Sequence, residues 1–169
     1  MNRNPTTIKK WNLRIFDWIE WIFNTCALLS FSGMIIAVFI QVYSRFAMES
    51  APNWTEELAR VFFIFTVAFA TGPAIRHGHF IKLDLVGKYF SSAHFRIYQR
   101  TISFLLFLFG ACLLLSAVKF TGLGMTERSP AMGLNMAYVF FSLFVLSLSM
   151  VAFYLEKMIN FKEEKELNA

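Results

Sequence analysis

Four long segments of this chain contain no Asp, Glu, Lys or Arg. They are Trp21–Ser44, Val61–Ile75, Thr101–Val118 and Ser129–Leu155. A membrane-spanning helix needs about 20 mainly apolar residues, with a range of roughly 17–25. The first and fourth segments are long enough, the third just reaches this length, and the second reaches it only if its helix begins near Trp54.

The composition indicates that lipid surrounds these segments. Of the 169 residues, 57% are hydrophobic and 16% are charged, whereas soluble domains carry about 45–50% apolar and about 25% charged residues. One small core cannot bury so much apolar surface. We therefore predict an all-α integral membrane protein in which residues 1–169 form a single membrane domain. Its four transmembrane helices are expected at about 18–45, 54–75, 100–119 and 133–156.

Proline, glycine and asparagine mark the ends of the second helix. Pro52-Asn53 is a start signal, with Asn53 as the expected N-cap. Gly72-Pro73 predicts a kink or an end just before Arg76.

Two further stretches combine apolar and charged residues at helical spacing. In the first, the apolar positions are Ile8, Trp11, Ile15, Trp18 and Ile22. Residues 80–98 contain a similar mixture. Helices of this kind lie in the membrane interface. We therefore predict interfacial helices on the cytoplasmic side at about 6–17 and 80–98.

The basic residues divide unequally between the two sides of such a membrane. Twelve lie on the side of the termini: Arg3, Lys9, Lys10, Arg14, Arg76, Lys82, Lys88, Arg96, Arg100, Lys157, Lys162 and Lys165. The opposite side has four, which are Arg45, Arg60, Lys119 and Arg128. Basic residues favour the cytoplasm, so both termini are predicted to be cytoplasmic. The first apolar run is too long for a signal peptide, and we expect that helix to be retained.

Several classes of protein are disfavoured by what the apolar segments lack. An anchor subunit that binds haem needs histidines inside its helices, but His77, His79 and His94 all fall between the second and third segments. A self-contained small-molecule exporter needs an ionisable residue near the bilayer centre, and no segment has one. The basic clusters do not form the continuous basic face typical of nucleic-acid binding. We expect no enzyme, no cofactor and no metal site; the exporter and the enzyme-complex anchor remain the alternatives.

A charged cluster falls at the ends of the first and second helices. Glu56 and Arg60 have the favourable i,i+4 order of an ion pair. Arg45 closes the first helix a short turn away, so we predict that it pairs with Glu56 or Glu57. The alternative is a solvated helix end, anchored by Trp54, whose exposed pairs contribute only about 0–1 kcal/mol.

Small residues recur on two of the helices. Gly33 and Ala37 lie four apart, and Gly110 and Ala117 lie seven apart. Such surfaces let helices approach closely. Packing within the chain and packing against a partner explain them equally well.

Three stretches, taken in order and spacing, resemble the small membrane subunit of tripartite ATP-independent periplasmic (TRAP) transporters. They are Arg45-Phe46 with Asn53-Trp54-Thr55-Glu56-Glu57-Leu58-Ala59-Arg60, then Arg76-His77-Gly78-His79-Phe80-Ile81-Lys82-Leu83-Asp84, then Ser129-Pro130-Ala131-Met132-Gly133-Leu134. The resemblance runs from about Gln41 into the fourth helix. Pro73 departs from it, because relatives are usually more helical there, and this leaves the exit angle of the second helix open.

The resemblance implies a role in the inner membrane of a bacterium. In that family a large membrane subunit holds the sodium and substrate sites and moves like an elevator. A soluble periplasmic protein delivers the substrate, an organic acid such as sialic acid or a C4-dicarboxylate. The small subunit packs against the large one, among membrane lipid, and enlarges its static scaffold. The residues expected at structural or partner contacts are Arg45, Trp54, Glu56, Glu57, Arg60, Arg76, Asp84, Ser129 and Pro130.

Overall fold

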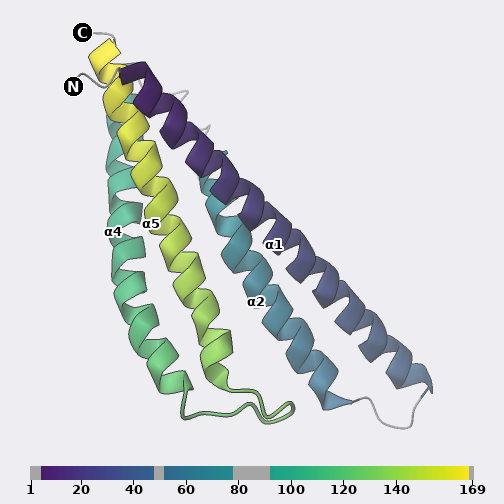
Figure 1. Ribbon diagram of the computed structural model, residues 1–169. Helices are drawn as coiled ribbons and strands as arrows, with labels where there is room; N and C mark the ends of the chain where they lie inside the picture. Colours follow the sequence, from purple (N-terminus) through teal and green to yellow (C-terminus); the bar gives the residue numbers. More distant parts are fainter. Residues whose placement is uncertain (1–4, 48–51, 78–91, 168–169) are drawn as a thin grey trace.

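The computed structural model describes residues 5–47, 52–77 and 92–167, with side chains over 14–47, 52–77 and 97–159. Its helices are α1 (Pro5–Ala47), α2 (Asn53–Arg76), α4 (Ser92–Gly124) and α5 (Met136–Leu167) (Figure 1). Each contains a stretch long and apolar enough to cross a membrane: Arg14–Ala47, Asn53–Arg76, Ile97–Gly124 and Met136–Ile159. The predicted all-α membrane fold with four spans is therefore confirmed.

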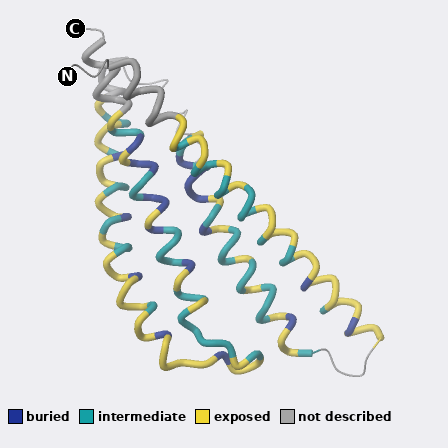
Figure 2. The backbone as a smooth tube through the Cα atoms, viewed as in Figure 1, coloured by how far each residue is buried: buried dark blue, intermediate teal, exposed yellow. Residues whose placement is uncertain are grey.

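The four helices form a row over most of their length, and at one end α1 also reaches α5 through ring contacts. Contacts join α1 to α2, α2 to α5, and α5 to α4. The α1–α2 hairpin and the α4–α5 hairpin converge at the end that holds both termini and spread apart toward the other end (Figure 1). Because a row has two open faces, large apolar side chains such as Tyr43 (75% exposed) and Phe46 (89% exposed) are accessible. Exposed positions recur along the helices (Figure 2). Lipid is the environment in which such exposure is not penalised.

The buried core lies where the two hairpins converge. It consists of Ile75 on α2 with Met150, Phe153 and Tyr154 on α5. The close approach depends on Gly72, because a Cβ there would lie 2.4 Å from Cε2 of Phe153. The Phe153 ring also contacts the rings of Phe16 and Phe23 from α1.

The other small residues also serve contacts within the chain. A Cβ at Gly33 would lie 2.9 Å from the Phe62 ring on α2, and one at Gly110 would lie 3.1 Å from Cβ of Met150 on α5. Ala37 and Ala117 are buried. Packing between neighbouring helices of this chain therefore accounts for both small-residue pairs.

The ends of α2 differ in part from prediction. The expected N-cap at Asn53 is wrong: Pro52 is the cap, with φ −70° and ψ 123°, and no side chain caps the helix. The fixed φ of proline suits this extended position, and the Thr55 hydroxyl donates to the Pro52 carbonyl oxygen at 2.8 Å. At the other end, α2 passes through Pro73 and ends at Arg76, within one residue of the prediction.

The predicted interfacial segments are only partly described. Residues 6–17 form the first turns of α1 without a break before the span. Residues 92–98 likewise continue into the span of α4, while residues 80–91 lie outside the described residues. An interfacial position for these segments remains a prediction.

Candidate functional site

Charged side chains gather at both ends of α2. Glu56 and Arg76 are twenty residues apart on this helix, which is about 30 Å of helical rise. The hydrocarbon core of a bilayer has the same thickness, about 30 Å. The two groups of charges therefore lie at opposite surfaces of the hydrocarbon core.

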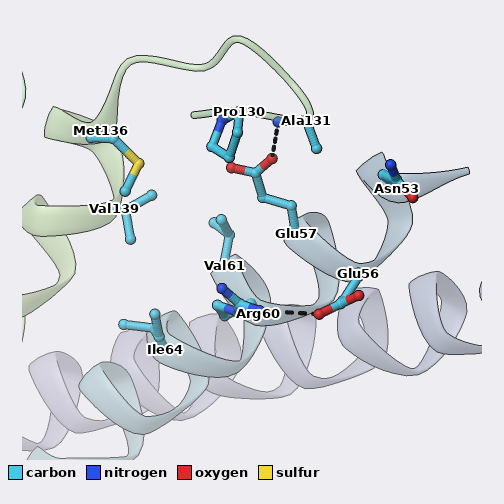
Figure 3. A pocket seen from close by; sticks show the side chains of 10 residues that line it. All are labelled: Asn53, Glu56, Glu57, Arg60, Val61, Ile64, Pro130, Ala131, Met136 and Val139. Atoms are coloured by element: carbon cyan, nitrogen blue, oxygen red, sulfur yellow. Dashed lines mark hydrogen bonds and ion pairs between the residues drawn. The ribbon is translucent and has the colours of Figure 1, made fainter. Parts of the chain in front are cut away.

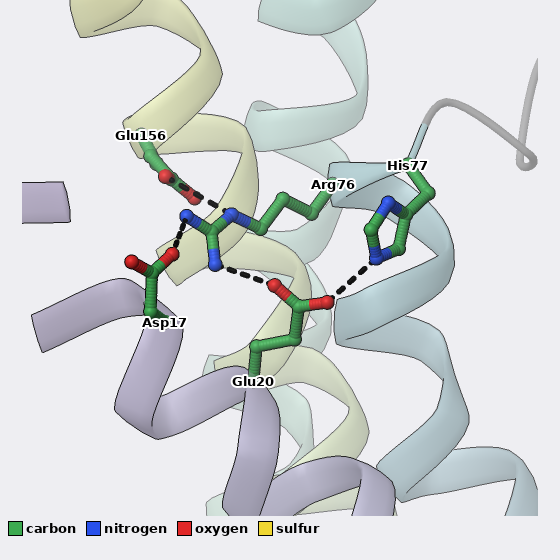
Figure 4. Close-up of polar contacts among 5 residues, drawn as sticks. All are labelled: Asp17, Glu20, Arg76, His77 and Glu156. Atoms are coloured by element: carbon green, nitrogen blue, oxygen red, sulfur yellow. Dashed lines mark hydrogen bonds and ion pairs between the residues drawn. The ribbon is translucent and has the colours of Figure 1, made fainter. Parts of the chain in front are cut away.

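At one surface, Arg76 joins three helices through its guanidinium (Figure 4). Nη1 donates to Oε2 of Glu20 at 2.5 Å and Nη2 donates to Oδ1 of Asp17 at 2.5 Å, both on α1. Nε lies 3.4 Å from Oε1 of Glu156 on α5. His77 Nε2 approaches the other oxygen of Glu20 at 2.6 Å. We call these five residues the Arg76 cluster.

Most of the charged groups in the Arg76 cluster are largely buried. The side chains of Arg76 and Glu20 are each 17% exposed, and that of Glu156 is 8% exposed. A guanidinium presents several donors in a fixed plane, which allows one side chain to bind three carboxylates at once. The cluster thus ties α1, α2 and α5 together where the hairpins converge.

Sequence reasoning named Arg76 but missed its partners Asp17, Glu20 and Glu156. A signal was present in the order of the spans. Asp17 and Glu20 precede the first apolar segment, Arg76 follows the second, and Glu156 follows the fourth. Four successive crossings bring these three positions to the same surface, so a search for opposite charges at that level would have found the cluster.

At the opposite surface, Glu57 holds the connection between α4 and α5 (Figure 3). Its Oε2 accepts hydrogen bonds from the backbone N–H of Ala131 at 3.2 Å and of Met132 at 3.0 Å. The connection also closes on itself, since the Ser129 N–H donates to the Leu134 carbonyl oxygen at 2.8 Å. A carboxylate shared by two backbone donors is a strong, charge-assisted contact. Glu57 therefore links the first hairpin to the second at the end where they spread apart.

Of the remaining charges at this end, one predicted pair forms and the other does not. Arg60 Nη2 donates to Oε1 of Glu56 at 3.1 Å, which confirms the i,i+4 pair. The predicted pairing of Arg45 with Glu56 or Glu57 is wrong: over the residues whose side chains are described, no ion pair joins them, and Glu57 turns to the α4–α5 connection instead. The α4–α5 hairpin lies beside α2, so two backbone N–H groups of its connection come within hydrogen-bonding distance of Glu57. The sequence alone did not show this proximity.

A pocket of about 380 Å³ opens between α2 and the α4–α5 connection (Figure 3). Its lining residues are Asn53, Glu56, Glu57, Arg60, Val61, Ile64, Pro130, Ala131, Met136 and Val139. Among the described residues, no three His, Cys, Asp or Glu side chains are placed to hold a metal ion.

Comparison with known families finds a match over about three quarters of the chain. The family described as "Tripartite ATP-independent periplasmic transporters, DctQ component" matches residues 34–162. This chain belongs to that family. It is therefore a small TRAP subunit, a transport component and not an enzyme, and a multi-pass protein of the inner membrane. A comparison with curated proteins found no match.

The family match covers all nine predicted contact residues of this small TRAP subunit, and they lie in separate places. Glu56, Glu57, Arg60 and Pro130 line the pocket, and Ser129 is buried in the connection. Trp54 is 41% exposed in the first turn of α2, and Arg45 lies at the exposed end of α1. Arg76 lies at the other surface, and Asp84 lies outside the described residues.

Proposed function

We propose that this chain is an accessory scaffold subunit, which packs against the large TRAP membrane subunit and holds no substrate or ion itself. The supporting observation is the row of helices described above. Over the described residues, such a row offers little interior in which to enclose a substrate. Its charges lie near the ends of the spans, whereas residues that bind ions within a membrane lie inside helices and face partner groups.

The partner of the row is a large apolar protein surface. Both faces of the row expose large apolar side chains, among them Leu28, Phe39 and Leu115. Lipid can cover one face, and the other is suited to a membrane partner through packing of side chains. The Arg76 cluster and the Glu57 contact fix the two hairpins relative to each other, as a static scaffold requires.

The cargo is an organic acid, sialic acid or a C4-dicarboxylate, imported with sodium after delivery by a periplasmic binding protein. The sodium and substrate sites belong to the large subunit. Both termini of this chain lie in the cytoplasm, so the pocket beside Glu57 lies at the periplasmic surface. The twelve-to-four division of basic residues supports this orientation.

Reconstitution tests the role. Vesicles would contain this chain alone, the large subunit alone, or both, with binding protein outside and an inward sodium gradient. Labelled sialic acid and labelled succinate are supplied separately. We expect uptake of one of them only when both membrane subunits and the binding protein are present. Sodium-driven uptake by this chain alone would overturn the scaffold role, and full uptake without this chain would overturn its participation in transport.

A further inference from the structure

The pocket beside Glu57 changes from polar to apolar with depth. Glu56 and Arg60 lie at its mouth, in the first two turns of α2. Val61 and Ile64 line it further along α2, and Val139 lines it from the first turn of α5 (Figure 3). The polar mouth lies about one hydrocarbon thickness from the Arg76 cluster. The mouth is therefore at the depth of the lipid headgroups. The apolar wall lies at the depth of the acyl chains.

The charged residues at the mouth differ in the contacts that they already make within the protein. Glu57 accepts two backbone hydrogen bonds from the α4–α5 connection. Glu56 and Arg60 pair with each other, and their side chains stay 63% and 68% exposed. The mouth thus presents one accessible anion next to one accessible cation. With Glu57 included, the three lining charges sum to −1, so the pocket repels a purely anionic group.

We propose that this pocket binds a zwitterionic phospholipid whose headgroup carries a phosphate and a primary amine, as phosphatidylethanolamine does. The phosphate accepts hydrogen bonds from Arg60, and the ammonium group donates to Glu56. One acyl chain lies against Val61, Ile64 and Val139. A soluble anion could contact the charges of the mouth but not the apolar wall, whereas a lipid covers the wall and binds both charges.

Bound lipid would fill the space that opens as the two hairpins spread apart. At the converging end the hairpins are joined by α2 with α5 and by the rings of α1 on Phe153, whereas at this end Glu57 joins them. A lipid wedged beside Glu57 therefore supports the spread arrangement in either membrane orientation. This assignment is independent of the cargo and of the large subunit.

Measuring how much lipid the protein binds tests the proposal directly. The full-length chain, alone and with its large subunit, is delipidated in mild detergent and mixed with phosphatidylethanolamine or phosphatidylglycerol. Native mass spectrometry then counts the bound lipid at increasing concentration. Arg60→Gln and Glu56→Gln remove the headgroup contacts, and Val61→Trp fills the acyl site. Arg128→Gln and Val67→Trp are the matched controls, because both residues are exposed and outside the pocket lining. Circular dichroism verifies that every variant is folded.

We expect one phosphatidylethanolamine to bind in preference to phosphatidylglycerol. Arg60→Gln should weaken it about tenfold, the effect of one charge-assisted hydrogen bond, and Val61→Trp should abolish it, while both controls bind like the parent. Equal binding by all variants would overturn the proposal. If phosphatidylglycerol bound as tightly as phosphatidylethanolamine, the proposed preference for a zwitterionic headgroup would be overturned. The lipid could instead be released when the large subunit binds, and the large subunit could then cross-link to Val61→Cys. That result would overturn the proposal and show that a protein side chain occupies the pocket.

Discussion

The Arg76 side chain illustrates how much of this protein's architecture depends on single polar residues. It binds carboxylates from α1 and α5 while belonging to α2. At the other surface, Glu57 binds the α4–α5 connection through two backbone donors. Apolar contacts in lipid are weakly specific, because acyl chains are as apolar as leucine. Polar residues therefore determine how the two hairpins are placed.

Removing the Arg76 guanidinium leaves Glu20 and Glu156 without their cation in a site that is mostly screened from water. Arg76→Gln should lower the free energy of unfolding by about 3 kcal/mol. Arg60→Gln is the matched control, and its exposed pair predicts a loss below about 1 kcal/mol. Equilibrium unfolding in sodium dodecyl sulfate measures both. Adding Glu156→Gln to Arg76→Gln should recover part of the loss, and similar small losses for the two single variants would contradict this account.

Glu57→Ala frees the backbone N–H groups of Ala131 and Met132. Local opening of the α4–α5 connection should then become more frequent, and trypsin should cleave after Arg128 about tenfold faster. Limited proteolysis with mass spectrometry of the fragments measures the rate in vesicles. Glu56→Ala is the control, since the described hydrogen bond of Glu56 is with Arg60 on its own helix. Equal rates for the two variants would show that Glu57 does not hold the connection.

At the scale of the elements, α2 is the helix that joins the two hairpins. It contacts α1 along one side and α5 along the other. Its C-terminal half is the better buried part, with Ala68, Thr71, Gly72, Pro73 and Ile75 all buried. Gly72 permits this approach, because the Phe153 ring occupies the space of a side chain. Pro73 is tolerated near the helix end, where few backbone hydrogen bonds are lost.

Two glycine substitutions should have opposite effects on stability. In Gly72→Ala the new Cβ would lie 2.4 Å from Phe153, so the ring must move and the free energy of unfolding should fall by about 1–3 kcal/mol. Gly122→Ala meets no atom within 4 Å, and the higher helix propensity of alanine should raise stability by up to about 1 kcal/mol. Thermal unfolding in detergent distinguishes the two. Stabilisation by Gly72→Ala would contradict the observed packing of α2 on α5.

At the scale of the whole molecule, the row has a defined polarity. Both termini lie at the end where the hairpins converge (Figure 1), together with the Arg76 cluster. The connection from α4 to α5 lies at the end where they spread. This asymmetry gives the protein two different membrane surfaces, one tied by charges and one with an open pocket.

Cysteine labelling tests which surface faces the cytoplasm. Cys26 and Cys112 are first replaced by alanine, and single cysteines are introduced at Asn2, Ser50 and Asn168. The basic residues predict that a membrane-impermeant maleimide added to intact spheroplasts labels Ser50→Cys alone. Opening the cells should expose the other two sites. Labelling of Asn2→Cys or Asn168→Cys before opening would reverse the proposed orientation.

The sequence by itself determined the elements and the family. The presence of four spans follows from local composition, because a helix in lipid must be apolar over about 20 residues whatever its neighbours are. The Glu56–Arg60 pair was predictable for the same reason, since both residues lie on one helix. The resemblance carried by the motifs between Arg45 and Leu134 was confirmed by the family match.

Only the tertiary structure decided which helices are neighbours and which charges meet. The order α1, α2, α5, α4 placed Glu57 beside the α4–α5 connection and left Arg45 without the predicted pairing. It also gathered Asp17, Glu20 and Glu156 around Arg76. These contacts join residues distant in sequence, and apolar spans carry little information about their partners. Their pairing is fixed by polar contacts such as those of Arg76 and Glu57 and by close packing at Gly72, all of which join residues that the local sequence does not relate.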